Sequence, residues 1–133
     1  LIRVTKPGGR LLIVEPDHES RLLDSPYPEI SRKFFAFRNA TLRQPGIAHQ
    51  LYRLFREFGL VDVAVEPLTQ VTTDYAEIRP TADLLGGIRL AQRHGAVSAD
   101  EADRWSAALE EAIQQGTFFH AMSHFITTGR KPG

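Results

Sequence analysis

The stretch that decides the fold is Lys6-Pro7-Gly8-Gly9-Arg10-Leu11-Leu12-Ile13-Val14-Glu15-Pro16-Asp17. Pro7 presets φ at the second position of a tight turn, and Gly8 accepts the positive φ that the third position of a type II turn requires. The next four apolar residues, 11–14, show no polar alternation, which predicts a parallel strand that is buried on both faces. Pro16 cannot donate a hydrogen bond to a sheet, so we expect the strand to end there.

Hydrophobic periodicity assigns the rest of the chain. Apolar residues three and four apart predict helices, whereas Val61, Val63 and Val65 alternate with Asp62, Ala64 and Glu66, as in a half-exposed strand that ends at Pro67. Ser98 and Glu101 form a capping box that opens a helix. The expected helices cover residues 29–42, 48–58, 80–94 and 99–115, with a short turn at 75–78, and the final strand covers 118–128. This order of elements predicts an α/β fold in one domain.

Composition excludes several classes of protein. Sixteen basic and sixteen acidic residues cancel, so the chain has no basic excess for nucleic acid or for an anionic membrane surface. There is no cysteine, which excludes disulfides and thiolate chemistry. No apolar run approaches the roughly 20 residues of a membrane span, and no leader pattern is present, so we expect a cytoplasmic protein.

The chain opens at Leu1 without an initiator methionine and runs directly into the turn at residues 6–9. We interpret residues 1–5 as the last turn of a helix whose beginning is missing. A natural start at Leu1 is the alternative.

Three stretches resemble one known family in the right order. They are the segment 6–17, Leu54-Phe55-Arg56-Glu57-Phe58-Gly59-Leu60-Val61-Asp62-Val63, and Phe118-Phe119 followed by Phe125-Ile126-Thr127-Thr128-Gly129-Arg130-Lys131-Pro132. The family is that of class I S-adenosylmethionine-dependent methyltransferases, in particular the small-molecule enzymes related to the ubiquinone and menaquinone C-methyltransferases.

The resemblance implies a Rossmann-like sheet with strand order 3-2-1-4-5-7-6, in which strand 7 is antiparallel. Residues 10–15 would be strand 5, 61–66 strand 6 and 118–128 strand 7, so the chain would be the C-terminal half of that fold. The family's cofactor loop and its ribose-binding acid would both lie before Leu1. Gly86-Gly87 does not follow a strand, so we do not interpret it as that loop. The implied cofactor is therefore S-adenosylmethionine in the parent protein, and we expect the isolated chain to be inactive.

Candidate catalytic residues follow the strand 10–15. Ligands of open α/β sheets bind beyond the carboxyl ends of the strands, and Glu15, Asp17 and His18 lie there. One of them would orient the methyl acceptor or remove its proton. The alternative is that the two carboxylates cap backbone amides and that His18 is solvated.

Candidate substrate-binding residues lie in and after the segment 18–47, a region that often carries a substrate lid in the family. Phe34, Phe35, Phe37 and Arg38 could line an apolar acceptor pocket, and His49 could reach the same cleft. The alternative is core packing for the phenylalanines and a solvated Arg38.

The histidines at 120 and 124 have a spacing that would suit a metal ion on a helix. On a strand they stand about 13 Å apart, because each residue advances the chain by about 3.3 Å. We therefore predict no metal site there and interpret both as residues on the faces of the sheet.

Two functions remain open. The first is methyl transfer to a small, apolar or aromatic acceptor. The second is a non-enzymatic binding or dimerisation module, because an unpaired hydrophobic edge of the strand 10–15 would invite a homodimer.

Overall fold

The computed structural model describes residues 1–133, which form two compact units. Unit 1 comprises residues 1–20, 44–70 and 122–133, and unit 2 comprises residues 21–43 and 71–121. Helices and an antiparallel sheet are both present, so the expected α/β content is confirmed. No helix is long and apolar enough to cross a membrane.

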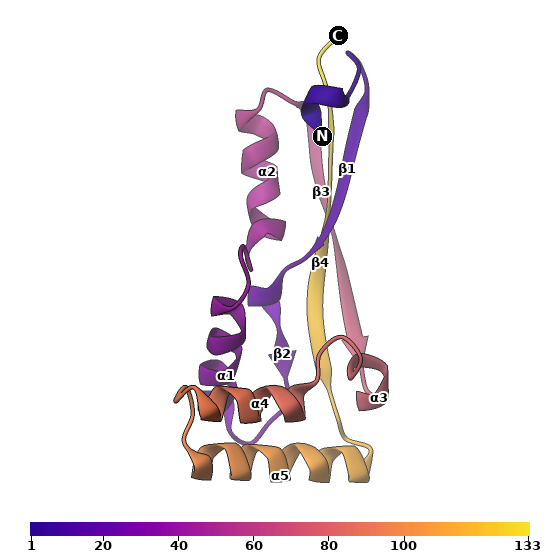
Figure 1. Ribbon diagram of the computed structural model, residues 1–133. Helices are drawn as coiled ribbons and strands as arrows, with labels where there is room; N and C mark the ends of the chain where they lie inside the picture. Colours follow the sequence, from indigo (N-terminus) through magenta and orange to yellow (C-terminus); the bar gives the residue numbers. More distant parts are fainter. The chain divides into compact units, whose positions relative to one another are not determined.

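The sheet is organised around β4 (His120–Arg130), which pairs with β1 (Arg10–Pro16) and with β3 (Val61–Thr72) (Figure 1). The β1–β4 pairing is antiparallel and runs from Arg10 opposite Arg130 to Pro16 opposite His124. On β3, Asp62 forms an ion pair with Arg130, whereas Thr69 hydrogen-bonds to Ser123. The β3–β4 pairing is therefore antiparallel as well. Because both partners pair along the same stretch of β4, β4 lies between them.

The turn before β1 and the helix after it agree with the local signals. Gly8 has φ +76° and the Gly9 N–H donates to the Lys6 carbonyl, as in the predicted type II turn. Residues 2–4 form a short 3-10 helix, η1 (Ile2–Val4). Helix α2 (Ile47–Glu57) packs on β1, and the core of unit 1 consists of Leu11, Leu51, Phe55 and Leu60.

Three expectations for unit 1 were wrong. The strand 11–14 is not buried on both faces, because Leu12 is 63% and Val14 46% exposed on the face opposite α2. The helix expected to end at residue 58 ends at Glu57, and Phe58 after it is 65% exposed. Finally, β3 continues through Pro67 to Thr72. Pro67 is tolerated because β3 pairs on one side only, so the missing N–H can face away from the sheet.

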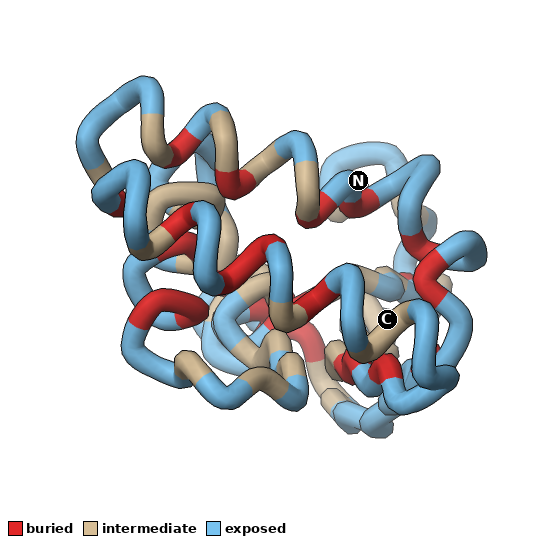
Figure 2. Tube along the Cα trace, turned by 90° about the horizontal axis from the view of Figure 1, so that it is seen from below, coloured by how far each residue is buried: buried red, intermediate tan, exposed pale blue.

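Unit 2 is a helical cluster with a short strand. Its elements are β2 (Leu22–Leu23), α1 (Pro28–Ala40), α3 (Tyr75–Ile78), α4 (Leu84–Arg93) and α5 (Ala99–Gln115), and β2 pairs with the first residues of β4. Helices α1, α4 and α5 contact one another, and α4 and α5 run in opposite directions (Figure 1). Along the helices, short buried stretches alternate with exposed ones, as amphipathic packing requires (Figure 2).

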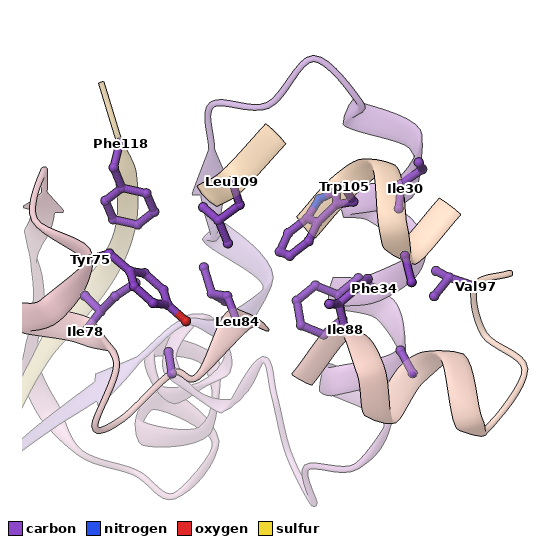
Figure 3. Packing of buried hydrophobic residues seen from close by; sticks show 13 residues of the cluster. Ile30, Phe34, Tyr75, Ile78, Leu84, Ile88, Val97, Trp105, Leu109 and Phe118 are labelled. Atoms are coloured by element: carbon purple, nitrogen blue, oxygen red, sulfur yellow. The ribbon is translucent and has the colours of Figure 1, made fainter. Parts of the chain in front are cut away.

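The core of unit 2 is built around Trp105 and Phe34, whose rings meet edge to face at 5.2 Å (Figure 3). The Trp105 indole N–H donates to the Ser31 hydroxyl at 2.9 Å, so the one buried polar atom of the ring has a partner. A second aromatic pair, Tyr75 and Phe118, has the same edge-to-face geometry at 5.5 Å. All four rings belong to one core cluster, to which α1, α3, α5 and the segment before β4 contribute.

Side-chain caps define where these helices begin. The predicted capping box of Ser98 and Glu101 is present at α5, which ends at Gly116 as expected. Helix α4 begins at Leu84 rather than at Pro80, because Asp83 accepts a hydrogen bond from the Gly86 N–H and caps the helix four residues later than predicted. Gly86 and Gly87 are interior residues of α4, in agreement with their interpretation as helical glycines.

Candidate functional site

The centre of the candidate site in unit 1 is a carboxylate–imidazole pair. Asp17 directly follows β1, and its Oδ2 lies 2.9 Å from Nδ1 of His49 in the first turn of α2. The Asp17 side chain is almost fully buried, whereas the His49 ring is about half exposed. A buried carboxylate that accepts the Nδ1–H directs the lone pair of Nε2 outward, so the His49 ring is oriented as a base that a ligand can reach.

Backbone and hydroxyl contacts fix the position of Asp17. Its N–H donates to the Ser123 carbonyl on β4 at 2.8 Å, and its carbonyl accepts from the Ser20 hydroxyl at 2.6 Å. The same hydroxyl accepts the Ser123 N–H at 2.9 Å, and Asp17 Oδ1 accepts the Glu19 N–H at 3.2 Å. The 3-10 turn η2 (His18–Ser20) thus connects the end of β1 to β4 and orients the carboxylate.

Two residues that the sequence reasoning did not single out complete this site. Glu19 places Oε2 3.8 Å from His49 Nε2, so the imidazole lies between two carboxylates. Gly46 precedes α2 and touches the ring: a Cβ there would come within 2.6 Å of His49 Cε1. Glycine is therefore required for the ring to lie where it does.

The three side chains Asp17, Glu19 and His49 are also the residue types that bind divalent metals. One ligand atom from each lies within 4.8 Å of the others. Both ring nitrogens of His49 already face a carboxylate, so a metal ion would have to replace one of these contacts.

The other residues predicted at the end of β1 have different surroundings. Glu15 is half-buried on the strand itself and lies opposite Phe125 of β4. His18 is half-buried in η2, and its backbone N–H donates to the Pro45 carbonyl at 3.2 Å. Of the three predicted catalytic residues, Asp17 is the one that the structure pairs with the predicted substrate residue His49.

The aromatic candidates and Arg38 belong to α1 in unit 2. Phe34 has no exposed surface and is part of the core, as the core-packing alternative expected. Phe35 and Phe37 are half-buried at the edge of the same core, and Phe37 contacts the His94 ring at 5.5 Å. Arg38 is half-buried, with its guanidinium 5.7 Å from the centre of the Phe34 ring.

A further polar contact in unit 2 links residues 99 positions apart. Arg21 Nη1 lies 2.7 Å from Nε2 of His120, which is 4% exposed. Burial first, then the positive charges of Arg21 and Arg38, lower the pKa of His120 to about 4. His120 is therefore neutral at pH 7 and accepts a hydrogen bond from Arg21. The sequence pattern around His120 indicates a residue on the face of a strand, and nothing in it indicates Arg21 as its partner.

Similar chains occur among known sequences and among solved structures. No family model matches. The chain is 30% identical over 131 residues to an uncharacterised 37.1 kDa protein of transposon TN4556 from Streptomyces fradiae. That alignment covers 96% of this chain and 36% of the relative, so the chain spans about a third of the relative's length.

Among solved structures, the chain is similar to phosphoethanolamine N-methyltransferase 2 of Haemonchus contortus, which was solved with phosphomonomethylethanolamine and S-adenosylhomocysteine. The alignment covers 99% of this chain and 28% of that one, at 16% identity and a TM-score of 0.39. At these values the likeness carries no argument about the chemistry of this chain.

Proposed function

We propose that this chain supplies strands 5 to 7 of a class I S-adenosylmethionine-dependent methyltransferase of the small-molecule group related to the ubiquinone and menaquinone C-methyltransferases. The observation that supports it most is the order β1–β4–β3, in which β4 is antiparallel to both neighbours. The sequence resemblance independently implies that order, 5-7-6, for the same three segments. The acceptor in this proposal is a small apolar or aromatic molecule.

Within this proposal His49 orients the acceptor or takes its proton. Asp17 accepts the Nδ1–H, so the lone pair is on Nε2, and a hydroxyl or amine of the acceptor would take the place beside Nε2 that the exposed Glu19 carboxylate has at 3.8 Å. After proton transfer, Asp17 and Glu19 flank the imidazolium and stabilise its charge. General-base catalysis of this kind contributes roughly 10²–10⁴-fold to a rate, and correct orientation of the reactants contributes more.

In this proposal the residues of this chain do not form the cofactor site. S-adenosylmethionine would supply the electrophilic methyl group, and the family holds it with a glycine-rich loop after a strand. Here Gly86-Gly87 lies inside α4, and β1 is followed by η2. We therefore assign to this chain the acceptor side of the reaction only.

The test is a transfer assay on the protein encoded by the complete reading frame that contains these residues. Methyl-labelled S-adenosylmethionine and a panel of small aromatic and apolar acceptors are the probes. We expect label transfer, and we expect His49→Asn to lower kcat by about 10²–10⁴-fold. The control is His94→Asn on an exposed histidine. Absence of both cofactor binding and transfer would refute the proposal, and submicromolar cofactor binding by the 133-residue chain would refute our assignment of the acceptor side alone.

A second candidate function, a non-enzymatic dimerisation module, is favoured by one observation. Leu12 and Val14 expose apolar side chains on β1, and β1 pairs with β4 on one edge only. A second copy could pair along the free edge. Sedimentation of the chain then gives a dimer that Leu12→Lys shifts toward the monomer, whereas a monomer at all concentrations argues against this candidate.

A further inference from the structure

Two arginines of unit 2 are half-buried without a carboxylate partner, whereas the other arginines that form no ion pair are exposed. Arg21 precedes β2, and Arg38 is on α1. Neither forms an ion pair, although both are half-buried. By contrast, five arginines pair with carboxylates at 2.7 to 2.9 Å: Arg32, Arg53, Arg89, Arg104 and Arg130.

Burial disfavours the charged form of an arginine that has no carboxylate partner. Burial first, then the charge of Arg38, lowers the pKa of Arg21 to about 10. Burial also lowers the pKa of Arg38, partly offset by Asp83 and Tyr75. In both cases burial is the largest cause, so each guanidinium has lost part of its hydration, and no ion pair with a carboxylate replaces it. A half-buried cation in such surroundings gains from a bound anion.

The carboxylate that raises the pKa of Arg38, Asp83, already has other partners. Asp83 Oδ1 accepts the Gly86 N–H at 3.1 Å and the Tyr75 hydroxyl at 3.3 Å, as the cap of α4 requires. Its negative charge raises the pKa of Arg38, but it forms no hydrogen bond or ion pair with that arginine.

Neighbouring rings orient both guanidinium groups. Arg21 Cζ lies 5.6 Å from the centre of the Phe35 ring, and Arg38 Cζ lies 5.7 Å from that of Phe34. His120 accepts one N–H of Arg21 at 2.7 Å. A guanidinium has five N–H donors in one plane, so each arginine retains donors that no protein acceptor uses.

We propose that Arg21 and Arg38 together form a binding site for an oxyanion group, a carboxylate or a phosphate, of a small molecule. Planar guanidinium groups match the spacing of two oxygens on such a group and bind it in a bidentate manner. Phe34 and Phe35 orient the pair, and His120 orients Arg21 as a neutral acceptor. This site is in unit 2 and does not depend on the methyltransferase proposal.

The test is titration of the 133-residue chain with inorganic phosphate and, separately, with benzoate at neutral pH and low ionic strength. Calorimetry should show saturable binding of at least one probe, and the probe that binds identifies the chemistry of the ligand. Arg21→Gln and Arg38→Gln should each weaken binding about tenfold or more, because each removes charge-assisted hydrogen bonds. The matched control is Arg93→Gln, which changes an exposed arginine of α4 that forms no ion pair.

A second readout separates binding from a structural effect of the arginines. A bound anion offsets the positive charges near His120, so saturation with the probe should raise the pKa of His120, followed by NMR of its ring. The conservative variants Arg21→Lys and Arg38→Lys keep the charge and should retain part of the affinity if the glutamine variants fail to fold. Lack of saturable binding of both probes overturns the proposal, and so do arginine variants that bind as tightly as the control.

Discussion

Acidification should destabilise this protein through His120, and the structure gives the size of the effect. The folded-state pKa of His120 is about 4, against an ordinary value of 6.5. Above pH 6.5 the imidazole is neutral in both states, and its full contribution to stability is present. As the pH falls from about 6.5 to about 4, the unfolded chain binds a proton that the folded chain rejects, so stability falls by about 1.4 kcal/mol per pH unit. The sum is about 3 kcal/mol, a large part of the stability of a small domain.

The assay is urea unfolding at a series of pH values, followed by the fluorescence of Trp105, the single tryptophan. Carboxylates also titrate in this range, so the informative quantity is the difference between the wild type and His120→Gln, a variant that does not titrate. This difference in unfolding free energy should shrink by about 2–3 kcal/mol between neutral pH and pH about 4. Arg21→Gln should reduce the pH dependence, because it removes a positive charge next to the imidazole.

The reasoning is refuted if the curves of the wild type and His120→Gln run parallel over this range. It is refuted equally if NMR of the folded protein shows that His120 titrates at its ordinary value. Either result would mean that water or a rearranged side chain solvates the imidazolium in the folded state.

Three more outcomes follow from single contacts. Gly46→Ala should move the His49 ring away from Asp17, because the new Cβ would overlap it, and should lower the free energy of unfolding by roughly 1–3 kcal/mol, because the buried carboxylate loses its partner; NMR contacts of the ring check this. Asp17→Asn should lower the free energy of unfolding by roughly 1–3 kcal/mol in urea, since a buried charge-assisted hydrogen bond is lost. Ser31→Ala should cost roughly 1–3 kcal/mol, because the buried Trp105 N–H loses its acceptor, and unchanged stability would contradict this assignment.

Local signals predicted the elements of the fold well, because caps and turns depend on neighbouring residues. The turn with Gly8 at its third position, the capping box of Ser98 and Glu101, and the helix stop at Gly116 were all confirmed. The start of α4 was wrong because two capping candidates competed: Pro80 fits a first turn, but Asp83 captures the Gly86 N–H. The sequence alone does not show which of two possible helix starts is the more stable.

The candidate site was predicted only in part. Asp17 was predicted as a site residue because it follows a strand, and His49 because it lies at the start of a helix. Their contact joins residues 32 positions apart in the chain and was not predicted. Glu19 and Gly46 carry no separate signal, since one is an exposed acid and the other a glycine before a helix. They matter because the fold places both against one imidazole ring.

By itself the sequence determined the identity of the helices and strands, since apolar spacing and capping chemistry act over a few residues. It also carried the order of segments from which the strand arrangement around β4 could be expected. Only the tertiary structure decided which polar groups meet and which surfaces stay open. Arg21 and His120 are 99 residues apart in the chain, and Leu12 looks like a core residue in sequence although it is exposed. Burial and long-range partners depend on how the elements pack, and that packing is a property of the whole chain rather than of any one stretch.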